Sequence, residues 1–501
     1  MSHKTKEQLG AEAVQIWNSI KDAQLSPKDR MAIPPQEMAT GDPAKRAREM
    51  SEVALGYTDE QARVEAARCL GCKNRPCVSA CPVGVPIPEF IACIQNGDYA
   101  KAVATIKTAN LLPAICGRVC PQERQCQSAC TLGKSLKSVD LSVAIGRLER
   151  FVADWERDNN RIIPPAVASP TGKKVAVIGS GPAGLTVAAD VRRAGHEVTV
   201  FEAFHKTGGV MVYGIPEFRL PKAIVQKEVD VLKAMGVVFR TNFLVGRTET
   251  IYDLLDREKY DAAFIGTGAG LPKFMDIPGE NLIGVFSANE YLTRANLMKA
   301  YDTSRAATPL YQAKTVAVVG GGNVAMDACR MAFRLGAEKV YCIYRRTRDE
   351  MPARVEEVNH AEEEGVEFLF LKNPTKILGD ETGKVRAVEV LEYELGEPDA
   401  SGRRSPVAKP GTEHEIPVDA MIVALGNESN PLMAQTTDGL ETTKRGNIVV
   451  DAKQRTSLKR VWAGGDIVLG AATVILAMGE GRKAAKSING YLAGNEEEQA
   501  D

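Results

Sequence analysis

The stretch Val175–Leu185, VAVIGSGPAGL, decides how most of the chain folds. Its first four residues predict a short buried strand, and Gly179, Gly181 and Gly184 follow at the spacing G-x-G-x-x-G. The first glycine permits a tight turn, the second lets the backbone approach a pyrophosphate, and the third lets the next helix pack closely on the strand. This pattern predicts a nucleotide-binding strand–loop–helix unit within a parallel α/β sheet.

The following strand, EVTVFEA at residues 197–203, ends in Glu202. A carboxylate at this distance from the loop can bind the diol of a ribose, so the loop and the acid together are a stronger signal than the loop alone. We interpret this first loop as an FAD site, in which Ala183 joins the three glycines.

A second loop, VAVVGGGNVAMDA at residues 316–328, repeats the device. The strand after it, KVYCIYRRTR at residues 339–348, ends in Arg345 and Arg346 instead of an acid. Guanidinium groups there would pair with the 2′-phosphate of NADPH, although a solvated basic strand end is the simpler alternative. The remaining candidate residues of this NADPH site are Gly320, Gly322, Asn323 and Ala325.

The third element that points to a flavin is RVWAGGDIVLGAATVILAMGEGRKAAKSI at residues 460–488. In this stretch an acid, Asp466, follows a glycine pair, and the pattern after it predicts a helix that begins near Ala472. The N-terminus of such a helix would stabilise a reduced, anionic flavin ring through its partial positive charge. The alternative is a surface acid before an ordinary amphipathic helix. The candidate residues are Gly465, Asp466, Ala472 and Thr473.

Nine of the eleven cysteines lie between Cys69 and Cys130, and all of these except Cys93, which we expect to be a core residue, form two sets with close spacing. Thiolates are soft ligands that select iron–sulfur clusters or zinc. Each set contains a Cys-Pro pair, as in [4Fe–4S] runs whose last cysteine can ligate the other cluster. Two structural zinc sites are the alternative. The first set is Cys69, Cys72, Cys77 and Cys81, and the second is Cys116, Cys120, Cys126 and Cys130.

Composition and length fit a globular protein of several domains: 501 residues, 44% hydrophobic and 25% charged. A net charge of −1 gives no electrostatic argument for nucleic acid. The charged N-terminus predicts no signal peptide, and no apolar run is long enough for a bilayer, so we expect a cytoplasmic location without membrane association.

The predicted fold is an N-terminal α-helical iron–sulfur domain followed by an α/β flavoprotein with two Rossmann-like dinucleotide-binding domains. Helical periodicity runs to about residue 160, and the linker RIIPPAVASPTGKK follows. We expect the cluster domain at residues 1–165, the FAD domain at 166–305 and 421–501, and the NADPH domain at 306–420.

Together these motifs resemble the glutamate synthase small-subunit family. This family also includes the N-terminal part of dihydropyrimidine dehydrogenase and the large subunit of the NADH-dependent ferredoxin:NADP oxidoreductase. The stretches that carry the resemblance are CGRVCPQERQC, IGSGPAG, GGVMVYGIPEFRLPK, YRRTRDEMPAR and AGGDIVLGAATVILAMGEGRKAA.

The resemblance implies two interleaved [4Fe–4S] clusters, with Cys116 as an unligated neighbour. It also implies a segment that lines the flavin ring. One cluster would take Cys69, Cys72, Cys77 and Cys130, and the other Cys81, Cys120, Cys126 and Glu149, although Glu149 could instead be a helix-surface acid. The flavin segment would comprise Gly208, Gly209, Tyr213, Gly214, Ile215, Pro216 and Arg219.

The expected function is an NADPH-dependent oxidoreductase subunit that passes electrons between NADPH, FAD and two [4Fe–4S] clusters to or from a partner. Hydride transfer needs no side-chain acid or base, so no catalytic residue is predicted. No length remains for the FMN-bearing barrel that glutamate synthesis requires, which makes this an electron-input subunit.

Three kinds of partner or role stay open. The first partner is the glutamate synthase large chain, in glutamate biosynthesis. The second is a flavin and [2Fe–2S] subunit of an electron-bifurcating transhydrogenase, with ferredoxin as a further candidate. A cluster-bearing redox sensor without enzyme activity is the third interpretation.

Overall fold

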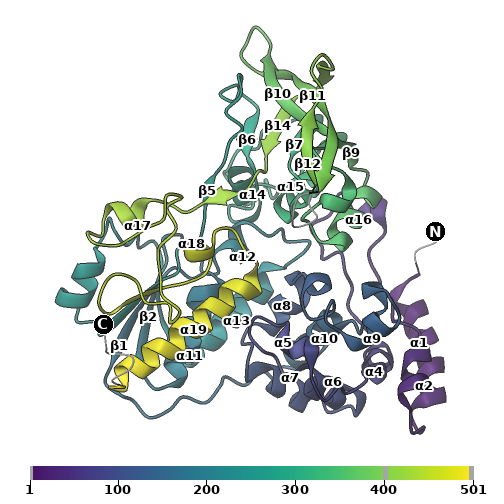
Figure 1. Cartoon of the computed structure of the whole chain (residues 1–501), viewed down its shortest axis with the longest axis vertical. Coiled ribbons are helices and arrows are strands. Elements are labelled where there is room, and N and C mark those ends of the chain that lie inside the picture. Colours follow the sequence, from purple (N-terminus) through teal and green to yellow (C-terminus); the bar gives the residue numbers. More distant parts are fainter. Residues whose placement is uncertain (1–3, 399–403, 496–501) are drawn as a thin grey trace.

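The computed structural model describes residues 4–398 and 404–495, as a helical N-terminal part followed by two parallel sheets (Figure 1). Capping residues fix several helix starts: Thr58 Oγ1 accepts a hydrogen bond from the backbone N of Gln61, and the backbone N of Thr58 donates in return to Gln61 Oε1. None of the helices in the described part of the chain has the length and apolar character that crossing a bilayer requires. The helices of the N-terminal part are α1 (Lys6–Ile20), α2 (Pro27–Ala32), α3 (Pro43–Arg46), α4 (Asp59–Ala67), α5 (Pro76–Ser79), α6 (Ile87–Gln95), α7 (Tyr99–Lys107), α8 (Pro113–Val119), α9 (Thr131–Ser135) and α10 (Ile145–Asp158), with 3-10 turns at Gln122–Arg124 and Val139–Leu141.

The first sheet has the order β16-β4-β1-β2-β3, and all its strands are parallel. The strand predicted from the first glycine loop is β1, and β16 comes from the C-terminal part of the chain. The strands are β1 (Lys174–Ile178), β2 (Glu197–Phe201), β3 (Val238–Arg240), β4 (Ala262–Ile265) and β16 (Val461–Ala463). The associated helices are α11 (Pro182–Arg193), α12 (Val210–Tyr213), α13 (Lys222–Ala234), α18 (Asp466–Leu469) and α19 (Val474–Leu492), with a π-helical turn at Asp253–Arg257 and the short α17 (Leu432–Gln435).

The second parallel sheet has the order β6-β14-β7-β8-β9. The expected domain boundary at residue 305 needs correction, because β6 pairs with β14 and therefore belongs to this second sheet. The strands are β6 (Val285–Ser287), β7 (Thr315–Val319), β8 (Lys339–Tyr344), β9 (Glu367–Phe370) and β14 (Ala420–Val423), and the helices are α14 (Ala288–Asn296), α15 (Asn323–Arg334) and α16 (Val355–Glu363), with a 3-10 turn at Arg348–Glu350.

An antiparallel sheet extends the second domain at the top of the view in Figure 1. No pattern in the sequence predicts this sheet. A two-stranded ladder of β5 and β15 lies between the two parallel sheets. The strands are β5 (Leu271–Pro272), β10 (Lys372–Gly379), β11 (Val385–Pro398), β12 (Arg404–Ala408), β13 (His414–Pro417) and β15 (Asn427–Glu428).

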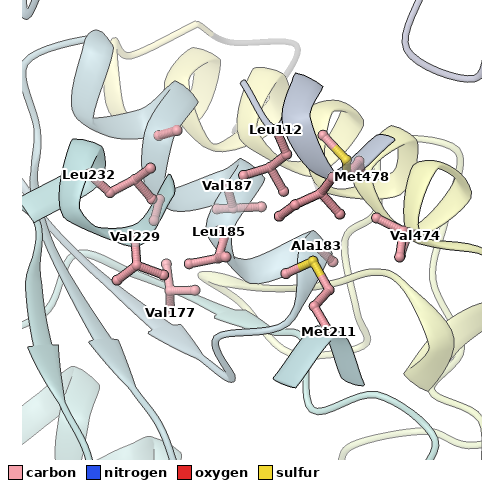
Figure 2. Packing of buried hydrophobic residues seen from close by; sticks show 14 of the residues in the cluster. Leu112, Val177, Ala183, Leu185, Val187, Met211, Val229, Leu232, Val474 and Met478 are labelled. Atoms are coloured by element: carbon pink, nitrogen blue, oxygen red, sulfur yellow. The ribbon is translucent and has the colours of Figure 1, made fainter. Parts of the chain in front are cut away.

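One hydrophobic core joins the helical part to the first sheet (Figure 2). Leu112, at the start of α8, belongs to the same cluster of buried residues as Val187 of α11 and Met478 of α19. Because the side chains interdigitate, the cysteine-rich part is held rigidly against the first dinucleotide-binding domain.

Buried ion pairs join the second domain to the other two. Arg219, from the segment after α12, binds Asp327 of α15 at 2.7 Å. Arg46 of α3 binds Glu364, the residue after α16, at 3.1 Å, and Arg330 of α15 binds the same glutamate at 2.8 Å. Such a network supplies specific orientation more than net stability, because each buried charge loses its hydration.

Candidate functional site

Four cysteines line one pocket, which we call the outer site: three are close in sequence and the fourth, Cys130, comes from much later in the chain. Cys69 follows α4, Cys77 lies in α5, and Cys130 is the N-cap of α9. Cys72 completes the set, and its Sγ lies 3.2 Å from the hydroxyl of Thr131. These are the four residues that the resemblance assigns to one cluster.

The thiols of the outer site are close enough to raise one another's pKa. Burial, and then the charges of Cys69 and Cys130, raise the pKa of Cys77 to about 12. Burial and the charges of Cys130 and Cys72 also raise the pKa of Cys69. Like charges at this separation disfavour the thiolate, so the array fits a cationic group that would hold all four as thiolates.

Three further cysteines and one carboxylate form a second group, which we call the inner site: Cys81, Cys120, Cys126 and Glu149. Burial and the charges of Cys81 and Glu149 raise the pKa of Cys126. Hydrogen bonding with Cys116, then burial and the charges of Cys116, Glu149 and Cys126, raise that of Cys120.

Glu149 lies on α10, where it is only 8% exposed, so it is not a helix-surface acid. Burial raises the pKa of its carboxyl to about 8, and a hydrogen bond from Asn110 Nδ2 to its Oε1 at 2.7 Å acts in the opposite direction. A buried carboxylate beside three thiols is a suitable fourth ligand for iron.

Within the described part of the chain, no three His, Cys, Asp or Glu side chains converge closely enough to hold a single metal ion. A [4Fe–4S] cluster does not need such convergence, because each ligand binds a different iron atom.

The inner site lies against α19, the helix predicted after the glycine pair Gly464 and Gly465. The Sγ of Cys116 is 3.6 Å from the Sδ of Met478. One residue further along α19, a Cβ on Gly479 would lie 3.0 Å from the carbonyl oxygen of Pro82, which directly follows Cys81. The guanidinium of Arg482 also donates to the carbonyl of Ala109.

The first glycine loop has the geometry of a pyrophosphate cradle. Gly179 has a φ of +98°, and a Cβ there would lie 2.4 Å from the carbonyl oxygen of Gly266. A Cβ on Gly184 would lie 2.0 Å from the carbonyl oxygen of Gly179, so α11 packs directly on the loop. At Gly181, by contrast, no atom of the described chain lies within 4 Å of an added Cβ. The second glycine therefore faces open space at the N-terminus of α11, where an anion fits.

Glu202 is buried at the end of β2 and is part of the loop structure. Its Oε2 accepts from the backbone N of Ser180 at 3.0 Å, and its Oε1 accepts from the N of Phe204 at 2.8 Å. Ser180 Oγ also donates to Oε2, so Oε1, which has a single donor, is the oxygen left to bind a ribose hydroxyl.

The segment at residues 208–216 crosses over the first loop. A Cβ on Gly209, whose φ is +55°, would lie 2.7 Å from the Cα of Gly181. The backbone N of Gly208 donates to Ser180 Oγ at 2.9 Å. Gly214, Ile215 and Pro216 end α12 and begin the next turn: both Gly214 and Ile215 donate to the carbonyl of Val210.

Acidic and phenolic groups gather beside this crossing. Burial, with the charges of Asp466 and Glu202, raises the pKa of Tyr213 to about 12. Burial raises the pKa of Asp466 to about 6, although the backbone N–H of Ala472 opposes the shift. Thr473 caps α19, which starts at Val474, close to Ala472 as predicted.

Two residues predicted at the FAD site, Ala183 and Arg219, make packing or ion-pair contacts within the protein. Ala183 is 3% exposed, and its Cβ is 2.9 Å from the position of a Cβ on Gly465. Arg219 lies away from the crossing: its Nη1 binds Asp327 and its Nε lies 3.0 Å from Glu357. The structure therefore assigns Arg219 to the junction with the second domain, and its pKa is raised by those carboxylates against the effect of burial.

The second glycine loop repeats the geometry of the first. Gly320 has a φ of +141°, and the nearest atom to a Cβ on Gly322 is Pro352 Cγ at 4.0 Å. Asn323 Oδ1 accepts from the backbone N of Arg354 at 2.9 Å, and Ala325 is fully buried in α15. The sequence analysis overlooked Gly321, where a Cβ would lie 2.6 Å from the ring of Tyr344.

The two arginines after β8 differ in their surroundings. Arg345 is exposed and has no ion-pair partner among the residues that the structure describes. Arg346 is 8% exposed, and its Nε donates to the carbonyl of Arg404 on β12 at 3.0 Å. Arg345 is thus the more accessible of the two to a phosphate.

Family models match both parts of the chain. Residues 46–161 match the description "Dihydroprymidine dehydrogenase domain II, 4Fe-4S cluster", and residues 173–481 match "Pyridine nucleotide-disulphide oxidoreductase". The glutamate synthase [NADPH] small chain of Halomonas elongata is 37% identical over 460 residues, covering 89% of this chain and 94% of the relative. The chain belongs to the glutamate synthase small-chain family.

Other members of the wider group serve different complexes. The NADP(+)-dependent formate dehydrogenase subunit beta of Moorella thermoacetica is 41% identical over 443 residues, covering 83% of this chain and 60% of the relative. The solved structure of FprA from Mycobacterium tuberculosis shares the fold, with a TM-score of 0.54, 19% identity and coverage of 66% of this chain and 86% of that one. The Halomonas relative is named a small chain and the Moorella relative a beta subunit, and each of these names implies a partner subunit.

The family matches confirm the predicted fold class and the predicted cofactor classes: a 4Fe–4S domain precedes a flavin and pyridine nucleotide oxidoreductase. Like the other members of the small-chain family, the chain is an NADPH-dependent oxidoreductase.

Proposed function

We propose that this chain is the electron-input subunit of a glutamate synthase, with FAD on the first glycine loop, NADPH on the second, and one [4Fe–4S] cluster in each cysteine site. The observation that carries the proposal is that α19 contacts the immediate neighbours of the inner site: Cys116, which is hydrogen-bonded to Cys120, has its Sγ 3.6 Å from Met478 Sδ, and Gly479 lies against Pro82, the residue after Cys81. It supports a linear order of flavin, inner site and outer site.

When bound, NADPH supplies hydride, FAD exchanges it for single electrons, and the clusters carry these. The residues of the chain position these groups. The N-termini of α11 and α15 would hold the two pyrophosphates, and Glu202 would orient a ribose. The inner site would use Cys81, Cys120, Cys126 and Glu149, and the outer site Cys69, Cys72, Cys77 and Cys130.

The outer site is the more accessible of the two, which supports its role as the contact with a partner. All four of its cysteines are half-buried, whereas Cys120 and Cys126 of the inner site are buried. Exposed Lys73, Lys134 and Lys137 lie in the adjoining segments, so an acidic partner surface would be favoured there. A cytoplasmic location is part of the proposal.

The partner decides the reaction. Co-purification of the native complex should yield a large chain, and the complex should form glutamate from glutamine and 2-oxoglutarate only with NADPH. A complex that instead oxidises formate would favour the second candidate, an NADP(+)-dependent formate dehydrogenase, whose beta subunit is 41% identical. A small flavin and [2Fe–2S] partner would identify a transhydrogenase. Failure of the isolated chain to reduce a dye with NADPH would reject enzyme function and favour a redox sensor.

Reversal of the charge at Arg345 should change the preference between NADPH and NADH. Arg345→Glu removes a guanidinium from the exposed end of β8 and should raise the KM for NADPH by about 10- to 100-fold, as expected for losing a charge-assisted hydrogen bond. The KM for NADH should change little. Steady-state dye reduction with each nucleotide measures both values.

Lys339→Glu, at the opposite end of the same strand, is the matched control and should leave both KM values unchanged. Equal losses for NADPH and NADH in Arg345→Glu would contradict recognition of the 2′-phosphate. Arg346→Glu is a less selective test, because Arg346 also supports β12.

A further inference from the structure

Asn110 is a buried polar residue that no motif identified. It lies in the turn between α7 and α8 and has no exposed surface. Its backbone N donates to the carbonyl of Ile106 at 2.8 Å, which fixes the residue at the end of α7. A fully buried amide must satisfy its hydrogen bonds inside the protein, so its partners indicate what it does.

The hydrogen bonds fix which way the carboxamide faces. Asn110 Oδ1 accepts from the backbone N of Leu112 at 2.9 Å. An amide nitrogen cannot accept that bond, so the flipped orientation is excluded and Nδ2 must face Glu149. Nδ2 donates to Glu149 Oε1 at 2.7 Å, which is a short, charge-assisted distance.

This bond restrains the carboxylate that completes the inner site. With Oε1 held by Asn110, Oε2 is the oxygen left for a ligand. The backbone N of Cys120 donates to the carbonyl of Cys116 at 3.1 Å, and Cys120 and Cys126 are buried like Glu149. Asn110 also touches the side of the site that faces α19, because the Cys116 thiol lies 3.8 Å from Asn110 Oδ1 and 3.6 Å from Met478 Sδ.

We propose that Asn110 is a positioning residue of the inner cluster: it orients Glu149 so that one oxygen binds iron, and its N–H partly neutralises that ligand. The inference rests on the proposed function and on Glu149 as the fourth ligand. Hydrogen bonds around a cluster help to set its reduction potential. A hydrogen-bond donor to an anionic ligand stabilises the reduced, more negative cluster. Removing the Asn110 donor should therefore lower the reduction potential of the inner cluster.

Asn110→Asp separates this role from a structural one. The aspartate keeps an oxygen for the backbone N of Leu112 but replaces the N–H₂ by a carboxylate facing Glu149. Repulsion should displace Glu149, and the protein should lose up to half of its iron or show an altered EPR signal from one cluster only. FAD content and far-UV circular dichroism should stay as in the wild type.

Asn110→Leu removes the donor without adding a charge. We expect Asn110→Leu to retain its iron. The one-electron equilibrium of the inner cluster should shift by a factor of about ten, which lowers its midpoint potential by about 59 mV. EPR-monitored redox titration of the full chain measures this shift. In a Glu149→Gln background the effect of Asn110→Asp should largely disappear, because the two residues act through one contact.

Asn159→Asp is the matched control, since Asn159 also donates from Nδ2, to the carbonyl of Trp155 at 2.8 Å, at the end of the same helix α10 as Glu149. It should change neither iron nor EPR signals. If Cys81→Ser loses one cluster signal while Asn110→Asp keeps both clusters and their potentials, the inference about Asn110 is wrong and the proposed function stands. Wild-type protein without iron would overturn both.

Discussion

Replacement of Cys120 by serine is expected to remove the inner cluster and leave the outer cluster, the FAD and the fold in place. Cys120 follows α8, is 6% exposed and lies beside Glu149 and Cys126. A serine hydroxyl is a harder and weaker ligand for iron than a thiolate. The purified variant should therefore contain about half of the wild-type iron, as expected for losing one of two [4Fe–4S] clusters.

The same variant tests the order of the sites. Flavin reduction by NADPH should be unaffected in stopped-flow measurements, because the two glycine loops are intact. Reduction of the outer cluster by NADPH, followed by EPR, should fall to background, because in the proposed order the inner site lies between the flavin and the outer site. Dithionite should still reduce the outer cluster directly, which shows that it is present.

Cys116→Ser supplies a close control, since Cys116 lies one turn earlier in the same helix and in hydrogen-bond contact with Cys120. It should keep both clusters, as should Cys93→Ser on α6. Iron lost from Cys116→Ser but retained in Cys120→Ser would exchange the roles of the two thiols. A wild-type rate of outer-cluster reduction in Cys120→Ser would contradict the linear order.

The parallel strands could be predicted because their signal is local. β1, β2, β4, β7, β8, β14 and β16 coincide with short, mainly apolar runs, and glycine directly follows β1, β4, β7 and β16. β6 was missed because it has only three residues, Val285–Ser287, and its position depends on pairing with β14 much later in the chain. The antiparallel strands β10–β13 are only partly buried, so their apolar residues do not form a clear pattern.

The grouping of the cysteines could not be derived from spacing. Spacing places Cys81 with Cys69, Cys72 and Cys77, whereas the structure brings Cys130 to those three and leaves Cys81 beside Glu149. This exchange of Cys81 for Cys130 depends on how α6, α7 and α8 bring the chain back to the first three cysteines, which is set by tertiary packing. The family resemblance implied it, because relatives share the whole fold.

The burial of Glu149 likewise depends on helix packing. A Cβ on Gly117 of α8 would lie 2.5 Å from the backbone N of Arg150, so the two helices touch at that glycine and Glu149 is drawn into the contact. The sequence contains Gly117 but gives no sign of its partner. Arg219 was predicted beside the flavin because its neighbours in sequence lie at the crossing segment. Its long side chain instead reaches Asp327 of the second domain.

A single methyl group at each glycine loop should distinguish the two nucleotide sites. In Gly181→Ala, the added Cβ meets no atom of the described chain within 4 Å, and the backbone there is extended with φ of −69°. The fold should therefore be retained, or slightly stabilised by the loss of backbone freedom in the unfolded chain. The methyl would occupy the space that we assign to the pyrophosphate of FAD, so FAD affinity should fall.

Overpacking of this kind costs about 1–3 kcal/mol, so FAD should bind about 10- to 100-fold more weakly to Gly181→Ala. Gly322→Ala, where φ is −91° and the nearest atom is 4.0 Å away, is its counterpart. It should bind FAD normally and raise the KM for NADPH by a similar factor. Fluorescence titration of the deflavinated protein with FAD, and dye reduction with NADPH, measure the two effects.

Gly184→Ala gives the contrast, because its Cβ would lie 2.0 Å from the carbonyl oxygen of Gly179 and should destabilise the folded protein itself. The thermal unfolding temperature should therefore drop for Gly184→Ala and stay unchanged for Gly181→Ala. If Gly181→Ala instead weakened NADPH and left FAD bound, or Gly322→Ala released FAD, the assignment of the two loops would have to be reversed, because each methyl acts only on the nucleotide at its own loop.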